Sequence, residues 1–111
     1  MNWSKRVEIP EIDVLELSQE LQGGGALIDV RQLEEWEEAR VPGVKLIPLD
    51  ELEARVGEVP TDGRLYVICK SGGRSGHAVK FLRNRGVDAV NVAGGTLAWV
   101  ASGEQVDSGP S

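Results

Sequence analysis

Residues 64–85 read RLYVICKSGGRSGHAVKFLRNR and pass from an apolar strand, through a glycine loop, into a helix. The first six residues are rich in the aromatic and β-branched side chains that favour strands. Residues 71–73 form the loop, and residues 75–85 are predicted to form a helix with apolar side chains on one face, which Gly86 ends. Cys69 therefore lies where the strand stops and the loop begins.

The same alternation of strand and helix extends on both sides of this stretch. A helix is expected between a capping box that begins at Asp13 and the glycines at 23–25, which stop it. Further strands are expected at 26–30, 45–47 and 87–92, and further helices at 33–38, 49–56 and 96–102. This alternation predicts an α/β fold with a mostly parallel sheet, whose binding sites lie beyond the carboxyl ends of its strands.

The composition fits one compact domain. The chain has 111 residues and a formal net charge of -6; we place the domain at residues 1–103 and expect the small, polar residues 104–111 to be a mobile tail. No stretch approaches the roughly twenty apolar residues that span a bilayer, and residues 1–6 lack the pattern of a secretory signal. We therefore expect a cytoplasmic protein without a membrane partner, and the acidic balance argues against nucleic acid as a partner.

The chain has one cysteine, which excludes an intramolecular disulfide and a multi-cysteine zinc site. The Cys69 thiol is therefore either inert packing or the centre of the chemistry. In a tight loop that runs into a helix, backbone N–H groups can converge on one point, and the helix start adds partial positive charge there. Both effects lower the pKa of a thiol, so the surroundings of Cys69 favour a reactive thiolate.

The other loop residues support this interpretation. Two of them add positive charge and the glycines allow unusual backbone angles and the close approach of a ligand. The candidate binding residues of the loop are Lys70, Ser71, Gly72, Gly73, Arg74 and Ser75.

These residues resemble the active-site loop of single-domain rhodaneses, which reads Cys-x-x-Gly-x-Arg-Ser. The resemblance extends over residues 9–103 and includes a Leu-Ile-Asp-Val-Arg strand, a Glu-aromatic pair, a Pro-Gly turn and a closing Gly-Gly-x-x-x-Trp element. In this chain they are residues 27–31, 35–36, 42–43 and 94–99. The resemblance implies a three-layer fold in which a mostly parallel sheet of about five strands carries helices on both faces.

The resemblance also implies a reaction. The Cys69 thiolate would attack the outer sulfur of a small anionic donor such as thiosulfate, release sulfite and become a persulfide. An acceptor would then take the outer sulfur of the persulfide. Cyanide is the usual laboratory acceptor, and a thiol or a protein cysteine is the more plausible cellular one. The backbone N–H ring would stabilise the sulfur anion, Lys70 and Arg74 would attract the donor, and neither a metal nor an organic cofactor is needed.

Two positions depart from the family pattern. Arg40 stands where the family usually has a histidine, which bears on local packing or substrate preference more than on sulfur chemistry. Lys70 replaces a common arginine, which keeps the charge but loses the planar fork of a guanidinium.

The remaining polar and aromatic candidates are interpreted as structural. Asp29 and Arg31 flank a strand end and are expected to support it by pairing with each other or with nearby loops. His77 is expected at the surface of a helix rather than as a general base. Trp36 and Trp99 are expected in packing, and the acidic run at 34–38 is expected on a solvated helix face.

Three alternative functions stay open. A cysteine phosphatase or arsenate reductase also holds an oxyanion in a loop between Cys and Arg, but it places five residues between them, whereas Cys69 and Arg74 enclose four. A non-catalytic interaction module is a second alternative, because fold alone does not establish activity. A sulfur relay that serves a partner protein, with little thiosulfate activity, is the third.

Overall fold

The computed structural model describes residues 9–110. Residues 1–8, which include the segment inspected for a secretory signal, and residue 111 lie outside the described residues. Five parallel strands form one sheet in the order β1-β5-β4-β2-β3, which confirms the predicted α/β fold. The strands are β1 (Glu11–Ile12), β2 (Ala26–Asp29), β3 (Lys45–Leu46), β4 (Leu65–Ile68) and β5 (Ala89–Val92).

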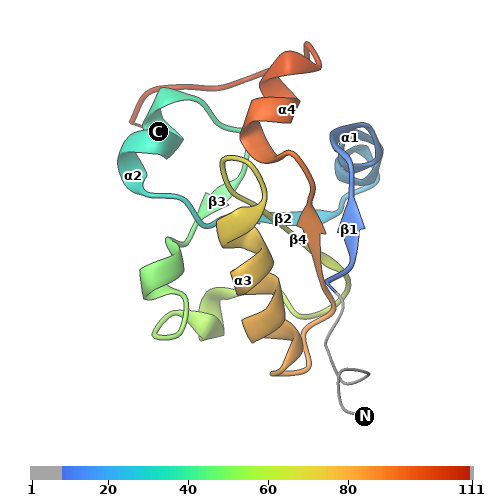
Figure 1. Ribbon diagram of the computed structural model, residues 1–111, viewed down its shortest axis with the longest axis vertical. Helices are drawn as coiled ribbons and strands as arrows, with labels where there is room; N and C mark the ends of the chain where they lie inside the picture. The colour runs from blue at the N-terminus through green and yellow to red at the C-terminus, as the bar shows by residue number, and fades with distance from the viewer. Residues whose placement is uncertain (1–8, 111) are drawn as a thin grey trace.

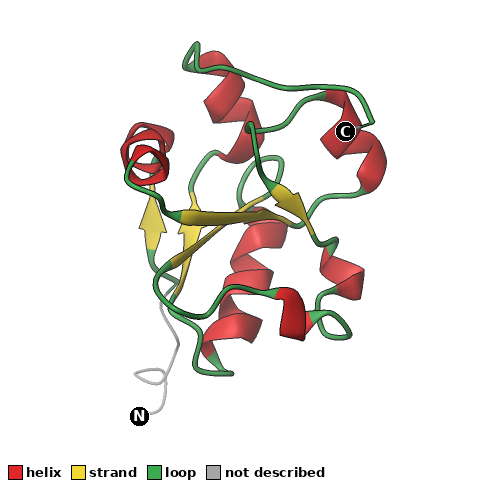
Figure 2. Ribbon diagram, turned by 180° about the vertical axis from the view of Figure 1, so that it is seen from behind, coloured by secondary structure: helices red, strands yellow, loops and turns green. Residues whose placement is uncertain are grey.

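Helices cover both faces of this sheet, as Figures 1 and 2 show from opposite sides. The helices are α1 (Val14–Gln22), α2 (Leu33–Glu38), α3 (Gly73–Arg83) and α4 (Gly95–Ala101), and the 3-10 turns are η2 (Leu49–Glu51) and η3 (Val56–Glu58). On one face, side chains of α3 and the 3-10 turns pack with Leu65, Val67 and Cys69. On the other face, side chains of α1 and α4 pack with Tyr66 and Ile68. Alternate residues along β4 and just after it thus pack into two separate hydrophobic cores, one on each face of the sheet.

The first helix follows the sequence signals closely. The Asp13 carboxylate accepts a hydrogen bond from the backbone N–H of Glu16, and the Glu16 carboxylate accepts one from the backbone N–H of Asp13. This capping box satisfies two N–H groups that the helix itself leaves free. The helix then buries Val14 and Leu17 against the sheet.

The structure corrects the helix expected at 49–56. Two separate 3-10 turns lie there instead, because Arg55 leaves the helical region of backbone angles, with φ -110° and ψ 17°. The Arg55 side chain is held in this position by hydrogen bonds to the carboxylates of Glu51 and Glu58. The strand β1 was not predicted, because its two residues are too few to show a strand pattern in the sequence.

Residues 104–110 are mostly exposed and are joined to the domain by hydrogen bonds; the mobility expected from their composition stays a prediction. In Figure 1 this segment passes from α4 across to α2. The backbones of Arg40 and Asp107 exchange hydrogen bonds of 2.9 and 3.0 Å, and the N–H of Gly109 donates to the carbonyl of Glu37. The Arg40 guanidinium also donates to the carbonyl of Gly109 and stacks on the Trp36 ring, 3.7 Å from its centroid. The residue that replaces the usual histidine therefore holds the C-terminal segment.

Candidate active site

Cys69 follows the last residue of β4, the middle strand of the sheet. It is 1% exposed, and its side chain belongs to the core on the α3 side. The next residues turn back toward the sulfur, and Gly72 has φ +112°, in the left-handed region that glycine adopts readily. The helix α3 begins at Gly73, two residues before the predicted start at Ser75, so its first turn forms part of the loop.

Hydrogen-bond donors converge on the Cys69 sulfur. The backbone N–H of Gly72 lies 3.1 Å from Sγ, and the hydroxyl of Ser75 lies 3.2 Å from it. Burial raises the pKa of the thiol, but the Ser75 hydroxyl and the backbone N–H groups of Ser75, Gly72 and Ser71 outweigh it, so the pKa lies below the ordinary value. The site therefore favours a sulfur anion.

Helix α4 holds the start of the loop from the other side. The backbone N–H and the hydroxyl of Thr96 both donate to the carbonyl of Cys69, at 2.8 and 3.0 Å, and the N–H of Leu97 donates to the carbonyl of Lys70. This close approach requires glycine at position 95, where a Cβ would lie 2.5 Å from the Lys70 carbonyl oxygen. The Gly-Gly element of the sequence thus positions the loop carbonyls.

Arg74 is engaged by α2. Its two terminal nitrogens donate to the two carboxylate oxygens of Glu35 at 2.7 and 2.8 Å. The hydrogen bonds from Arg74 lower the pKa of Glu35 to about 2. The sequence suggested that Arg74 attracts the donor, but in the structure both terminal nitrogens of its guanidinium are bonded to the Glu35 carboxylate.

Lys70 is exposed and forms no ion pair with any residue in the range 9–110. It lies on the wall of a cavity of about 250 Å³ between α2 and α4, which Cys69 itself does not line. Leu97 and Val100 of α4 line the same cavity and are 56% and 47% exposed. Ser71 is exposed, and its contribution to the site comes from its backbone N–H.

Asp29 and Arg31 form a buried ion pair where β2 ends. The Arg31 guanidinium donates to both carboxylate oxygens of Asp29, with the shortest distance 2.7 Å, and to the carbonyl of Ala39 at 2.7 Å. The pair therefore ties β2 to the end of α2. Arg31 also reaches the cavity that Lys70 lines.

The remaining candidates take structural places. His77 is exposed on α3. The Trp99 indole is buried and donates to the carbonyl of Gln105, while Trp36 lies under Arg40. Sequence reasoning missed Asn91, a buried polar residue within β5 whose side chain contacts Ser75. The only sequence signal for it was an amide in an otherwise apolar strand.

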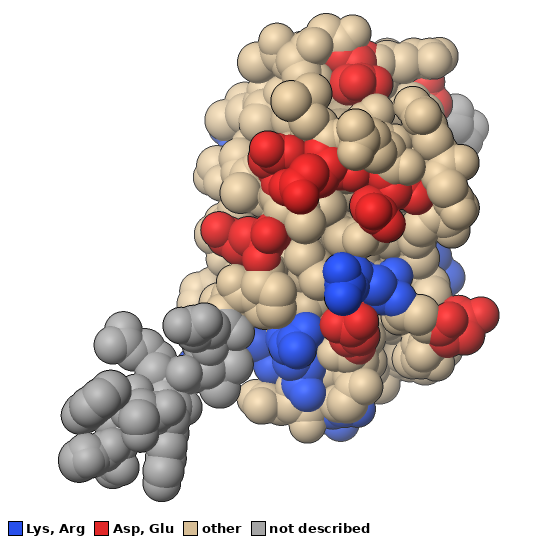
Figure 3. Space-filling view, turned by 90° about the vertical axis from the view of Figure 1, so that its right-hand side faces the viewer, with Lys and Arg blue, Asp and Glu red and all other residues tan. Residues whose placement is uncertain are grey.

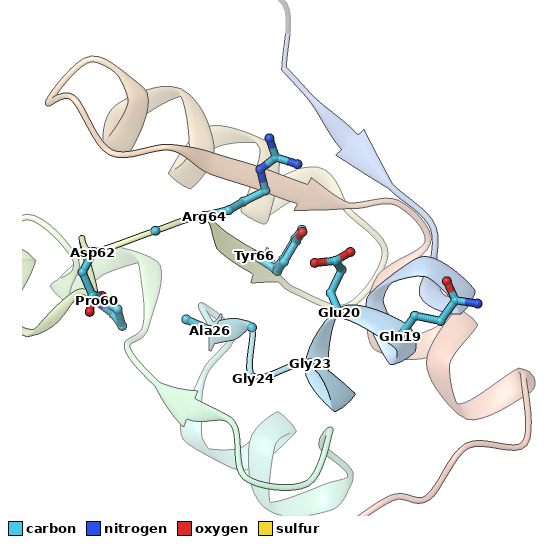
Figure 4. Close-up of a pocket in the computed structure, with 11 residues that line it drawn as sticks. Gln19, Glu20, Gly23, Gly24, Ala26, Pro60, Asp62, Arg64 and Tyr66 are labelled. Atoms are coloured by element: carbon cyan, nitrogen blue, oxygen red, sulfur yellow. The ribbon is translucent and has the colours of Figure 1, made fainter.

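A second cavity, of about 430 Å³, lies far from this loop at the amino ends of β2 and β4. Figure 4 shows Tyr66, Glu20 and Arg64 beside it, and burial raises the pKa of the Tyr66 hydroxyl. On the molecular face in Figure 3, acidic side chains spread over the upper part, and basic side chains gather in the lower part with further acidic ones among them. Within residues 9–110 no cluster of side chains could hold a metal ion, and none of the helices is long and apolar enough to cross a membrane.

Comparison with known proteins gives consistent matches. The profile of the rhodanese-like domain matches residues 13–102. YrkF of Bacillus subtilis is 38% identical over 86% of this chain and 54% of YrkF, so the chain spans about half of that relative. A sulfurtransferase of Allochromatium vinosum is 33% identical over 86% of this chain and 92% of its own length. The crystal structure of a rhodanese-related protein from Thermoplasma volcanium is 30% identical, with a TM-score of 0.83 over 88% of this chain and 97% of that one.

Proposed function

The chain belongs to the family of rhodanese-like domains, and from this premise we propose that it is a sulfurtransferase that carries sulfur on Cys69. The sulfur is a sulfane sulfur, held as a persulfide between a donor such as thiosulfate and a thiophilic acceptor. The convergence of the Gly72 N–H and the Ser75 hydroxyl on the Cys69 sulfur carries this proposal. These donors would stabilise the negative charge of both the thiolate and the persulfide.

The reaction has two displacements and needs no outside oxidant. In the first, the Cys69 thiolate attacks the outer sulfur of thiosulfate, a bond forms from Sγ to that sulfur, and the electron pair of the broken S–S bond leaves with sulfite. In the second, an acceptor attacks the outer sulfur of the persulfide and the Sγ–S electron pair returns to Cys69 as the thiolate. With cyanide as acceptor the product is thiocyanate.

The charges near the loop assign different roles to its two cations. Lys70 is exposed at the cavity wall and would attract the dianionic donor. Arg74 is paired with Glu35, so its role would be to hold the loop against α2. This assignment changes the role that the sequence suggested for Arg74 and keeps the one suggested for Lys70.

A protein thiol as acceptor is a second candidate within the same function. The exposed Leu97 and Val100 line the cavity beside Lys70, and an apolar rim of this kind suits a protein partner better than cyanide. Since Cys69 is buried, the acceptor cysteine would have to protrude on a narrow segment to reach the persulfide.

Intact-mass measurement after incubation with thiosulfate tests the proposal. Wild-type protein should gain the mass of one sulfur, and cyanide should remove it. Cys69→Ser is the matched control, since it replaces only the sulfur atom, and it should gain nothing. No gain of sulfur in the wild type from thiosulfate or from a persulfide donor, together with unchanged function of Cys69→Ser in cells, would favour a non-catalytic module. Turnover of an aryl phosphate would favour a cysteine phosphatase.

A further inference from the structure

A chain of hydrogen bonds leads away from the Cys69 sulfur, through the buried Ser75 and Asn91, to Glu11 of β1. The Ser75 hydroxyl, 3.2 Å from the sulfur, lies 2.5 Å from the side-chain oxygen of Asn91. Asn91 is 2% exposed on β5, and its amide nitrogen lies 2.9 Å from a carboxylate oxygen of Glu11 and 3.2 Å from the carbonyl of Gly72. None of the roles assigned so far to the loop uses Asn91.

The orientation of the Asn91 amide is determined by its partners. The carboxylate of Glu11 and the carbonyl of Gly72 can only accept hydrogen bonds, so the NH₂ group must face them. A flipped amide would place its oxygen against two acceptors and its NH₂ against the hydroxyl. The Asn91 oxygen therefore faces Ser75 as an acceptor.

The Ser75 hydroxyl has one proton and two neighbouring acceptors, the Asn91 oxygen and the Cys69 sulfur. We propose that Asn91 is a positioning residue for the nucleophile, which competes with the Cys69 thiolate for the single proton of Ser75. The inference rests on the proposed function for its purpose, because a tuned thiolate matters only to a reactive cysteine.

The competition affects the two protonation states differently. With a neutral thiol, the S–H group can donate to Ser75 while Ser75 donates to Asn91, and all groups are satisfied. With a thiolate, the Ser75 hydroxyl can donate to the sulfur only if it stops donating to the buried Asn91 oxygen. That oxygen is then left without a hydrogen-bond donor. Asn91 thus favours the thiol relative to a site without that acceptor. It moderates the acidity that the loop confers.

Replacing Asn91 by an uncharged residue leaves all the charged groups around the Cys69 sulfur in place. Lys70 and Arg74 come from the loop and the start of α3, Glu35 from α2, Asp29 and Arg31 from the end of β2, and Glu11 from β1. None of them is altered when Asn91 is replaced by an uncharged residue. A change in the titration of Cys69 then reports on the hydrogen bonds of Ser75.

The test is a pH titration of Cys69 in Asn91→Ala and Asn91→Leu, followed by the ultraviolet absorbance of the thiolate and by the rate of alkylation. Because the chain has one cysteine, both signals come from this site. In both variants Cys69 should titrate at lower pH than in the wild type, with a thiolate-to-thiol ratio roughly tenfold higher at a given pH. This change corresponds to the strength of about one hydrogen bond to a charged group. Asn91→Leu fills the space that alanine leaves empty, so the test holds if Asn91→Ala does not fold.

Ser75→Ala provides the matched background. In this background, replacement of Asn91 should leave the titration of Cys69 unchanged, because no hydroxyl proton remains to compete for. An unchanged or higher titration pH after replacement of Asn91 alone would overturn the proposal, and so would an equal shift in the Ser75→Ala background. The titration needs no sulfur donor, so its failure is distinct from a failure of the sulfur-loading test.

Discussion

Neutralising Glu35 should separate α2 from the active-site loop. Glu35→Gln keeps the shape of the side chain but removes the charge that holds both terminal nitrogens of Arg74. The folded state lowers the pKa of Glu35 from 4.5 to about 2, which corresponds to a stabilisation of at most about 3 kcal/mol. The Arg74 side chain is 37% exposed, so solvent screening reduces the expected loss to about 1–2 kcal/mol.

The pH dependence identifies the source of this loss. Because the folded pKa is depressed, the stabilisation is fully present above the unfolded pKa of 4.5 and is lost as the pH falls toward about 2. Urea unfolding of the wild type and Glu35→Gln should therefore differ clearly near neutral pH and much less at about pH 3. The expected decrease in melting temperature near neutral pH is about 5–10 °C.

Glu34→Gln is the matched control for this experiment. Glu34 is an exposed residue in the first turn of the same helix, so its replacement removes the same charge from α2 without touching Arg74. It should cost no more than a few tenths of a kcal/mol. Equal losses for the two variants, or a loss in Glu35→Gln that persists undiminished at about pH 3, would refute the reasoning.

Four further predictions follow from other contacts. Gly95→Ala should lose about 2–4 kcal/mol in urea unfolding, because its Cβ would strike the loop carbonyls, while Gly103→Ala, with open space, should lose only about 1–2 kcal/mol; equal losses would contradict this. Lys70→Ala should raise the KM for thiosulfate about tenfold and Lys70→Arg should restore most of it, whereas an unchanged KM would remove Lys70 from donor capture. Arg40→Ala should release residues 104–110 to proteolysis and hydrogen exchange, and unchanged protection would show that the Arg40 side chain does not hold them. Leu97→Ser should slow sulfur transfer to a protein thiol but not to cyanide, and equal slowing of both would place its effect elsewhere.

The sequence predicts the strand, loop and helix around Cys69 because those signals are local. The apolar run, the glycines and the helix stop all lie within 64–86, and the structure confirms β4 and α3 there with shifts of one or two residues at their ends. The helix expected at 49–56 was wrong, because the chain forms two 3-10 turns with a break between them. Spacing alone cannot show that Arg55 leaves the helical region to bond with Glu51 and Glu58.

Contacts between distant residues were beyond the reach of sequence reasoning. Glu35 was noticed as part of a Glu-aromatic pair, but its partner Arg74 lies 39 positions away. Asn91 lies 16 positions from Ser75, and it had no motif to mark it. The C-terminal segment was expected to be mobile because it is small and polar, yet backbone groups, which composition does not describe, pair it with Arg40.

The geometry of the loop therefore depends on more than its own seven residues. Helix α4 holds the carbonyls of Cys69 and Lys70, and the carboxylate of Glu35 on α2 holds Arg74. A loop that contains Ser71, Gly72 and Gly73 has little stiffness of its own. Its N–H groups therefore point at one sulfur atom only while these contacts with α4 and α2 hold the loop in place. A loop of the same sequence transplanted to another scaffold would keep its residues and lose its directed donors. For this reason the pKa of Cys69 should respond to changes in Glu35 and Gly95, which do not touch the sulfur, as well as to changes in Ser75, which does.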